Sequence, residues 1–129
     1  MMGYSTNIEK DTLENTDFRR VLFTGPNVQL VLMSLRPGEE IGSEVHHGNE
    51  QFIRVESGTA VAKIGERQFD LTDGSIIVVP AAARHNVTNT SSTEDLKLYT
   101  LYAPPHHPEG TIQHTKTEAD AAEVLVHST

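Results

Sequence analysis

Turn-forming residues recur roughly every ten positions through the middle of this chain, and the stretches between them show no helical periodicity. Those stretches are short and rich in β-branched and apolar residues. Short strands separated by tight turns are typical of antiparallel sandwiches and barrels. The sequence therefore predicts an all-β fold, with turns at Gly25-Pro26-Asn27, Arg36-Pro37-Gly38, Gly48-Asn49, Gly65-Glu66 and Asp73-Gly74.

The two ends of the chain depart from this pattern. Residues 1–17 are polar and predict an N-terminal arm or a short edge strand, and residues 18–114 hold the predicted strands. We interpret residues 115–129 as the only helical segment, because Thr115 and Glu118 have the spacing of a capping box. On that helix the residues expected to face the barrel are Ala122, Leu125 and Val126.

Polar side chains of one parity lie in the stretch Gly38 to Gly58. Glu44 and His46 share a face of a predicted strand, and Gln51 opens the next strand after the turn. His47 has the opposite parity, so we interpret it as a solvent or interface residue. If this hairpin packs against the one that follows residue 74, all three side chains converge with His85.

The spacing in both stretches resembles the two motifs of the cupin superfamily. In the first motif the chain gives Gly38, five residues, Glu44, one, His46, four, Gln51, six and Gly58. The family frame is kept, but Glu44 stands where the first histidine is usual and Gln51 stands where a glutamate is usual. The second motif reads Gly74, five residues, Pro80, one, Ala82, two, His85, three and Asn89, and only Ala82 replaces a usual glycine.

The resemblance implies a small antiparallel jelly-roll barrel that holds one divalent metal ion. Carried over residue by residue, the ligands are Glu44, His46, Gln51 and His85. One carboxylate and two imidazoles suit Fe, Mn, Ni, Co or Zn, so the metal stays open. The alternative is a metal-free cupin in which these polar side chains only hydrogen-bond one another.

The segment after the last predicted strand, residues 104–116, resembles the tail of small cupins labelled mannose-6-phosphate-isomerase-like. His106 and His107 are expected to close over the barrel mouth and to act as general acid or base, with Tyr102 as a further catalytic candidate. A second metal site that combines these histidines with His114 and Glu109 is less favoured than a surface loop.

Composition limits the chemistry and the partners. The chain has no cysteine, which excludes disulfides and thiolate ligands, and its net charge of −8 argues against a nucleic-acid partner. No apolar run reaches the length of a membrane span and no signal-peptide segment is apparent, so we expect no membrane partner and a cytoplasmic location. Phe52, which points outward by parity, is the candidate contact of a homodimer.

Three functions remain open from the sequence. The first is a metal-dependent enzyme, of isomerase, lyase or dioxygenase type, that acts on a small oxygenated molecule. The others are a small-ligand-binding cupin without turnover and a structural cupin. Parity turns Arg54 and Arg84 away from the interior, so we expect a non-phosphorylated substrate. Gln29 is a polar residue in an apolar run, and its side chain is either a pocket residue or a hydrogen-bonded amide.

Overall fold

The fold is built almost entirely from antiparallel strands. The structure is a computed structural model that describes residues 3–127, with side chains up to residue 123. Within that range two helices flank the strands, and no helix is long and apolar enough to cross a membrane. The elements are α1 (Ile8–Glu14), β1 (Arg19–Thr24), β2 (Gln29–Leu35), β3 (Glu50–Ser57), β4 (Ala60–Ile64), β5 (Arg67–Leu71), β6 (Ile76–Val79), β7 (His85–Asn89), β8 (Leu96–Ala103), β9 (Ile112–Gln113) and α2 (Lys116–His127).

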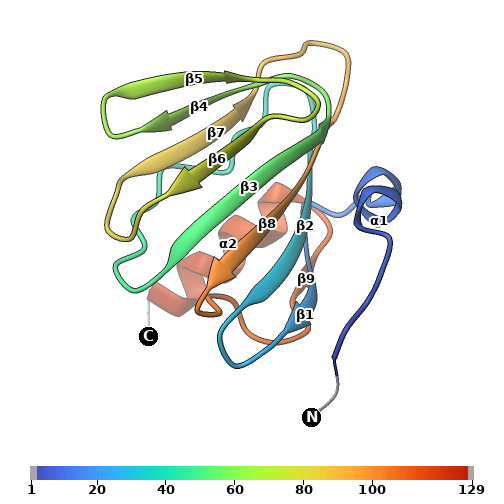
Figure 1. The fold of residues 1–129 in the computed structure, drawn as a ribbon. Helices are drawn as coiled ribbons and strands as arrows, with labels where there is room; N and C mark the ends of the chain where they lie inside the picture. The colour runs from blue at the N-terminus through green and yellow to red at the C-terminus, as the bar shows by residue number, and fades with distance from the viewer. Residues whose placement is uncertain (1–2, 128–129) are drawn as a thin grey trace.

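The strands form two sheets that enclose the core as a jelly roll. The larger sheet has the order β6-β3-β8-β2-β1-β9 and the smaller has the order β5-β4-β7, as Figure 1 shows. Every pairing is antiparallel. The predicted all-β jelly roll with a short C-terminal helix is therefore confirmed, although the two sheets do not close into a complete barrel.

Alternation along the strands decides which side chains fill the space between the sheets. In β8, Leu96, Leu98, Thr100 and Tyr102 are all buried while the residues between them are not. Gln29, Tyr102 and Gln51 are aligned at one end of β2, β8 and β3, and buried leucines such as Leu35 and Leu96 are aligned at the other end. The functional site is located at the polar end, where the buried polar residues include Gln29, Gln51, His46 and His85.

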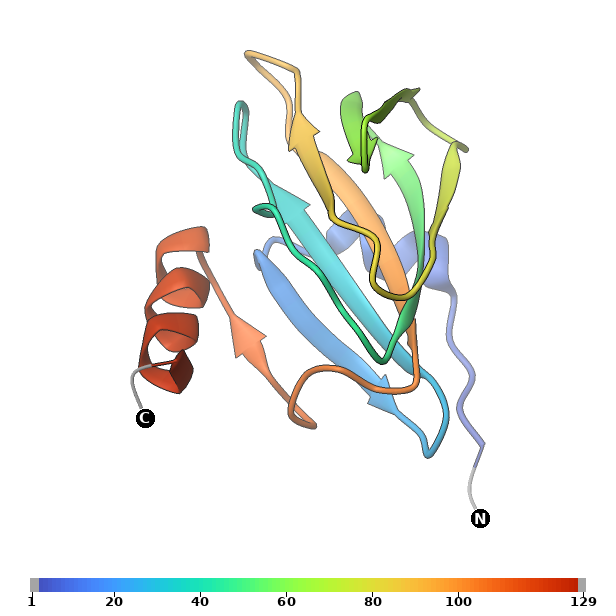
Figure 2. The same ribbon diagram turned by 90° about the vertical axis from the view of Figure 1, so that its left-hand side faces the viewer.

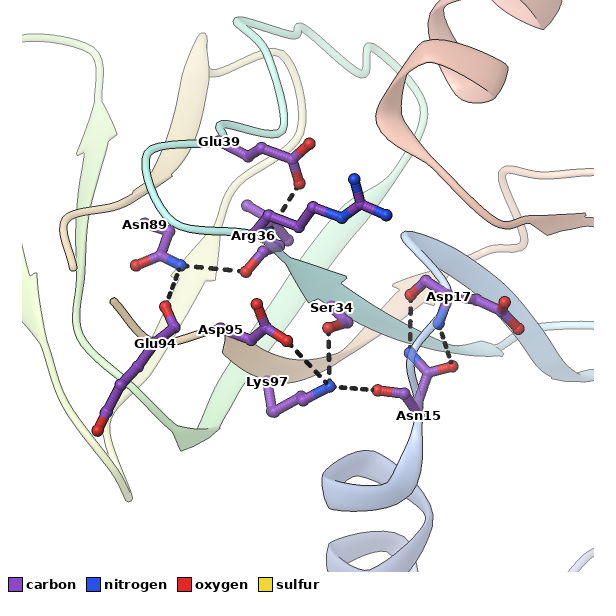
Figure 3. Close-up of polar contacts among 10 residues, drawn as sticks. Asn15, Asp17, Ser34, Arg36, Glu39, Asn89, Glu94, Asp95 and Lys97 are labelled. Atoms are coloured by element: carbon purple, nitrogen blue, oxygen red, sulfur yellow. Dashed lines mark hydrogen bonds and ion pairs between the residues drawn. The ribbon is translucent and has the colours of Figure 1, made fainter. Parts of the chain in front are cut away.

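The N-terminal segment forms a short helix, so the prediction of a helix at the C-terminal end alone is wrong. The side chain of Asn7 caps α1 by accepting a hydrogen bond from the Lys10 amide at 3.0 Å. Thr12, a residue of this helix, is fully buried. Beyond it, Lys97 Nζ on β8 donates to the Asn15 carbonyl at 2.6 Å and to Ser34 Oγ at 2.9 Å (Figure 3). The segment is thereby attached to the outer face of the larger sheet.

The C-terminal helix starts where the capping spacing predicts. Thr115 Oγ1 accepts a hydrogen bond from the Glu118 amide at 3.1 Å. Ala119 is the buried residue of α2 and Ala122 is half-buried, whereas the side chains of Leu125 and Val126 lie outside the described residues. In Figure 2, α2 lies to one side of the strands beside β9, and α1 lies behind the strands.

The segment that carries Glu44 and His46 differs from its prediction. It is not a regular strand; only isolated bridges pair Glu40 with Thr88 and Glu44 with His85. Gly58, at the end of the same motif, has a φ of 99° and lies so close to β8 that an added Cβ meets the Asp95 carbonyl oxygen at 2.8 Å. Only glycine combines that conformation with that approach.

Candidate metal centre

Backbone pairing brings three potential metal ligands together. The Glu44 amide donates to the His85 carbonyl at 2.9 Å, and the His85 amide donates to the Glu44 carbonyl at 3.0 Å. The Ala82 amide donates to the His46 carbonyl at 2.8 Å and fixes the next turn of the chain. The irregular segment 44–46 is thereby held along β7, which carries His85.

The side chains of this group offer their donor atoms to a common point. One donor atom from each of Glu44, His46 and His85 lies within 4.8 Å of the others. His46 Nε2 and Glu44 Oε2 are 2.7 Å apart. That pair lacks hydrogen-bond alignment, however, and within residues 3–127 His46 Nε2 has no hydrogen-bond partner. Buried polar atoms are normally paired, so this arrangement suits a ligand more than an internal network.

The tautomer of His85 leaves the lone pair of its Nε2 available to bind a metal ion. His85 Nδ1 lies 3.0 Å from the Ala83 carbonyl oxygen. A carbonyl oxygen can only accept, so Nδ1 carries the hydrogen and Nε2 carries the lone pair. Metal-bound histidines commonly donate their second nitrogen in this way.

Gln51, the fourth predicted ligand, lies in the same interior. It is 4% exposed and pairs in register with Tyr102 of β8. Its Nε2 donates to Thr100 Oγ1 at 3.0 Å, which directs the amide, while its Oε1 has no hydrogen-bond partner among the described residues. An amide oxygen is an oxygen ligand of the kind that hard divalent ions accept.

The electrostatics of the group favour a charged carboxylate. Burial disfavours the ionised form of Glu44, but the close contact with His46 and the positive charges of His46 and Arg19 outweigh it. The pKa of Glu44 therefore lies below its ordinary value. The donor set is one carboxylate and two imidazoles.

A buried glutamine holds a loop with two further histidines close to the metal-donor group. Gln29 is fully buried, and its Oε1 accepts from the His106 amide at 3.1 Å and the His107 amide at 2.9 Å. Its Nε2 donates to the His107 carbonyl at 2.8 Å and to Thr24 Oγ1 at 3.0 Å. Of the two readings of Gln29, the hydrogen-bonded amide is confirmed, and its function is to anchor residues 106–107.

The loop histidines form an aromatic cluster with the donor group. The His106 ring centroid lies 4.1 Å from that of His46 and 5.3 Å from that of Tyr102. His107 Nε2 lies 3.4 Å from the Tyr102 hydroxyl. The pKa of His106 is lowered mainly by burial and secondly by repulsion from His46. The pKa of His107 is lowered to about 2, again mainly by burial and secondly by repulsion from Arg19. Burial raises the pKa of Tyr102.

A cavity of about 830 Å³ opens beside the donor group. His106 and His107 line it together with Glu44 and His46, as the lid hypothesis expects. Among the described residues, His85, Gln51 and Tyr102 are buried but are not part of its wall. The other lining residues are Arg19, Ser43, Val45, Pro108, Thr111, Ile112, Gln113, Glu118, Ala119, Ala122 and Glu123.

Arg19 is the residue of the cavity that sequence reasoning missed. Arg54 and Arg84 face outward as parity predicts, with Arg54 paired to Glu56 and Arg84 bonded to Ser43. That expectation considered only these two arginines, whereas Arg19 is buried on the same strand parity as Val21. The alternation that places Arg19 on the inward face with Val21 is visible in the sequence, and it was the signal from which its burial could have been predicted.

The remaining histidine of the tail lies apart from the donor group. His114 is exposed, and its Nδ1 lies 2.6 Å from Asp17 Oδ1, so hydrogen bonding and attraction to Asp17 raise its pKa. Among the described residues, Glu44, His46 and His85 are the only group of such side chains able to hold a metal ion. The surface position of His114 is thus consistent with the interpretation of this segment as a surface loop without a second metal site.

Comparisons with known proteins point to one family. Residues 31–102 match the family described as "Cupin domain". The chain is 47% identical over 126 residues to the uncharacterized protein YrkC of Bacillus subtilis, covering 93% of this chain and 67% of that protein. It is 48% identical over 112 residues to the uncharacterized protein L612 of Acanthamoeba polyphaga mimivirus, covering 84% of this chain and 70% of the viral protein.

Solved structures agree with the sequence comparison. The crystal structure of BH2720 from Bacillus halodurans superposes with a TM-score of 0.89 at 44% identity, covering 93% of this chain and 95% of that one. TT1209 from Thermus thermophilus has a TM-score of 0.69 at 24% identity, covering 78% of this chain and 96% of that one, and so supports the fold alone.

Proposed function

The chain belongs to the cupin family, and on that premise we propose that it is a metal-dependent enzyme of isomerase or lyase type. Its substrate in this proposal is a small oxygenated molecule without a phosphate group. The observation that carries the proposal is the group formed by Glu44, His46 and His85, whose donor atoms lie within 4.8 Å of one another. Gln51 completes the proposed ligand set.

The residues present fit a divalent transition metal. His46 Nε2 and Gln51 Oε1 are buried atoms without hydrogen-bond partners in the described part of the chain, and a metal ion would satisfy both. Nitrogen and oxygen donors of this kind suit Fe, Mn, Ni, Co or Zn. A bound divalent ion would supply a Lewis acid that polarises an oxygen of the substrate.

The protein's own contribution to catalysis is a neutral base beside the donor group. His106 lines the cavity, contacts the His46 ring and has a pKa below its ordinary value, so its ring is free to accept a proton near neutral pH. Tyr102 keeps its proton because its pKa is raised, and its hydroxyl is placed to donate to His107 Nε2. In this proposal Tyr102 and His107 orient the loop, and His106 moves the proton.

This arrangement favours proton transfer over the dioxygenase alternative. Activation of dioxygen suits an apolar pocket, whereas the wall of this cavity carries charged side chains, including Arg19, Glu44 and Glu118, and three histidines. An isomerase or lyase needs a base within reach of a carbon acid, and in this proposal His106, which lines the cavity, is that base.

Metal content tests the proposed ligands. Protein purified without an affinity tag is measured by plasma mass spectrometry, and its melting is followed with and without chelator. We expect close to one equivalent of metal in the wild type, and a loss of that metal in His85→Ala. His47→Ala is the matched control, since His47 is exposed and points away from the group. A metal at 100 times its dissociation constant adds about 2.7 kcal/mol of stability. A folded wild type that takes up none of these metals would refute the proposal.

Exchange of carbon-bound hydrogen tests the reaction type. We would incubate small hydroxy-carbonyl compounds with the metal-loaded enzyme in deuterium oxide and follow the α-hydrogens by NMR. His106→Asn should abolish exchange while keeping the metal. Exchange that is unchanged in His106→Asn would remove the proposed base.

We also propose that the outer face of the larger sheet pairs with a second copy of the chain. Phe52 lies in register between Val78 of β6 and Leu101 of β8, which forms an apolar row. Val78 is 53% exposed and Ile76 on the same strand is 47% exposed. Contiguous exposed apolar side chains of this kind support a protein contact.

A further inference from the structure

The guanidinium group of Arg19 is buried, and although its charge attracts Glu44, it forms no ion pair in the described part of the chain. Arg19 is 7% exposed, and no described carboxylate forms an ion pair with it. Its Nη1 donates to the neutral Gln113 Oε1 at 2.8 Å, and its Nε has no hydrogen-bond partner within residues 3–127. A desolvated cation is costly unless an anion accompanies it. The position therefore calls for an anionic ligand.

Arg19 and the metal-donor group share one cavity but come from different elements. Arg19 lies on β1 and pairs in register with Gln113 of β9, whereas Glu44 and His46 belong to the segment held along β7. The cavity of about 830 Å³ is lined by all four of these residues, Arg19, Gln113, Glu44 and His46. That volume is in the ordinary range for small-molecule sites, about 300–1,000 Å³. A small ligand can thus reach the guanidinium and the donor group together.

The charges of the wall favour a carboxylate over a phosphate. Arg19 is the one lysine or arginine among the described lining residues, while Glu44, Glu118 and Glu123 are acidic. A phosphate dianion usually binds several cationic donors or a helix N-terminus. A single guanidinium edge matches a carboxylate in two parallel hydrogen bonds. Nη1 is engaged by Gln113, and a carboxylate placed on the Nε edge would satisfy the unpaired Nε.

We propose that Arg19 binds a carboxylate group of the substrate, so that the ligand of this cavity is a small 2-hydroxy or 2-oxo acid held between Arg19 and the metal donors. Gln113 is a positioning residue that fixes the guanidinium plane. The inference rests on the proposed function, because it takes the same cavity as the substrate site.

The test compares ligand binding in full-length, Mn(II)-loaded protein. Glycolate and pyruvate are titrated by calorimetry, with methyl pyruvate and inorganic phosphate as the neutral and phosphate probes. The variants are Arg19→Met, which removes the charge, and Arg19→Lys, which keeps the charge without the planar fork. Arg20→Met is the matched control, since Arg20 is exposed and pairs with Asp17 on the other face of β1.

We expect the wild type to bind glycolate or pyruvate and Arg19→Met to bind them about 10- to 100-fold more weakly, the size of a lost charge-assisted pair. Arg19→Lys should retain part of the affinity, and Arg20→Met all of it. Uptake of Mn(II) should be the same in all four proteins, because Arg19 is not a ligand.

The outcomes separate the two proposals. If neither Mn(II) nor Fe(II), Ni(II), Co(II) or Zn(II) binds the wild type, the metal proposal fails, and the carboxylate titration is then read on the metal-free protein. If Mn(II) binds but Arg19→Met retains wild-type affinity for pyruvate, or methyl pyruvate binds equally well, the carboxylate inference is overturned. Tighter binding of phosphate than of pyruvate overturns it as well.

Discussion

Replacement of Gln29 by methionine should release the histidine loop without disturbing the packing of β2. Methionine keeps the length of the side chain and its apolar contacts but cannot make any of the four hydrogen bonds of the glutamine amide. Three of these bonds go to the backbone of His106 and His107 at 2.8–3.1 Å. Each buried bond contributes about 1 kcal/mol, so loss of the three bonds to the loop alone should lower the unfolding free energy by about 3 kcal/mol. For a domain of this size that lowers Tm by roughly 10 °C.

Urea unfolding followed by circular dichroism measures this loss, and hydrogen exchange by NMR measures the loop itself. The amides of His106 and His107 should be protected in the wild type and exchange faster in Gln29→Met. The matched control is Gln68→Met, the same change at an exposed position of β5. If Gln29→Met stays within about 1 kcal/mol of the control and both amides remain protected, the loop is held by something other than Gln29.

Three further predictions concern the turn, the pH dependence and the assembly. Ala82 has a φ of 69°, so Ala82→Gly should raise the unfolding free energy by about 0.5 kcal/mol, whereas Ala81→Gly, measured in the same urea series, should lower it. The pKa of His107 is about 2 in the folded protein and near 6.5 when unfolded, so the unfolded state binds more protons below neutrality and stability falls as pH drops from 7 to 5. His107→Gln should remove about 2 kcal/mol of that fall at most, and equal slopes in urea titrations of both proteins would contradict the assignment. Val78→Asp should convert the proposed dimer to monomer in sedimentation velocity without unfolding it; a monomeric wild type would end that proposal.

The fold could be predicted from the sequence because turn spacing and strand alternation are local patterns, and the donor group could be predicted because the spacing of the two motifs is kept. Turn spacing and strand alternation predicted the sheets, and the inward parity of Leu96 to Tyr102 is confirmed. The motif spacing brought Glu44, His46 and His85 together even though their segment is not a regular strand. Pairing across the barrel, not strand regularity, positions these side chains.

The features that sequence reasoning missed depend on contacts between distant segments. Helix α1 has a single capping residue and one buried threonine, which is a weak local signal for seven residues. The two hydrogen bonds from the amides at 106 and 107 to Gln29 join positions 77 and 78 residues apart, and no local pattern encodes them. Arg19 is a different case, because its position in the alternation of β1 could be read from the sequence. Its burial was not expected, because isolated charged side chains are rarely buried.

The cavity wall is assembled from two parts of the chain with different origins. The segment that matches the cupin family, residues 31–102, contributes Glu44 and His46, whereas Arg19, Gln113 and both loop histidines lie outside it. On the proposals made above, the family segment supplies the metal donors, whereas the flanking segments supply the base His106 and the carboxylate-binding Arg19. A relative that shares only the family segment would therefore keep the metal donors without this base or this substrate contact. Exchange of both flanking segments between two such proteins is then a direct route to a new substrate preference.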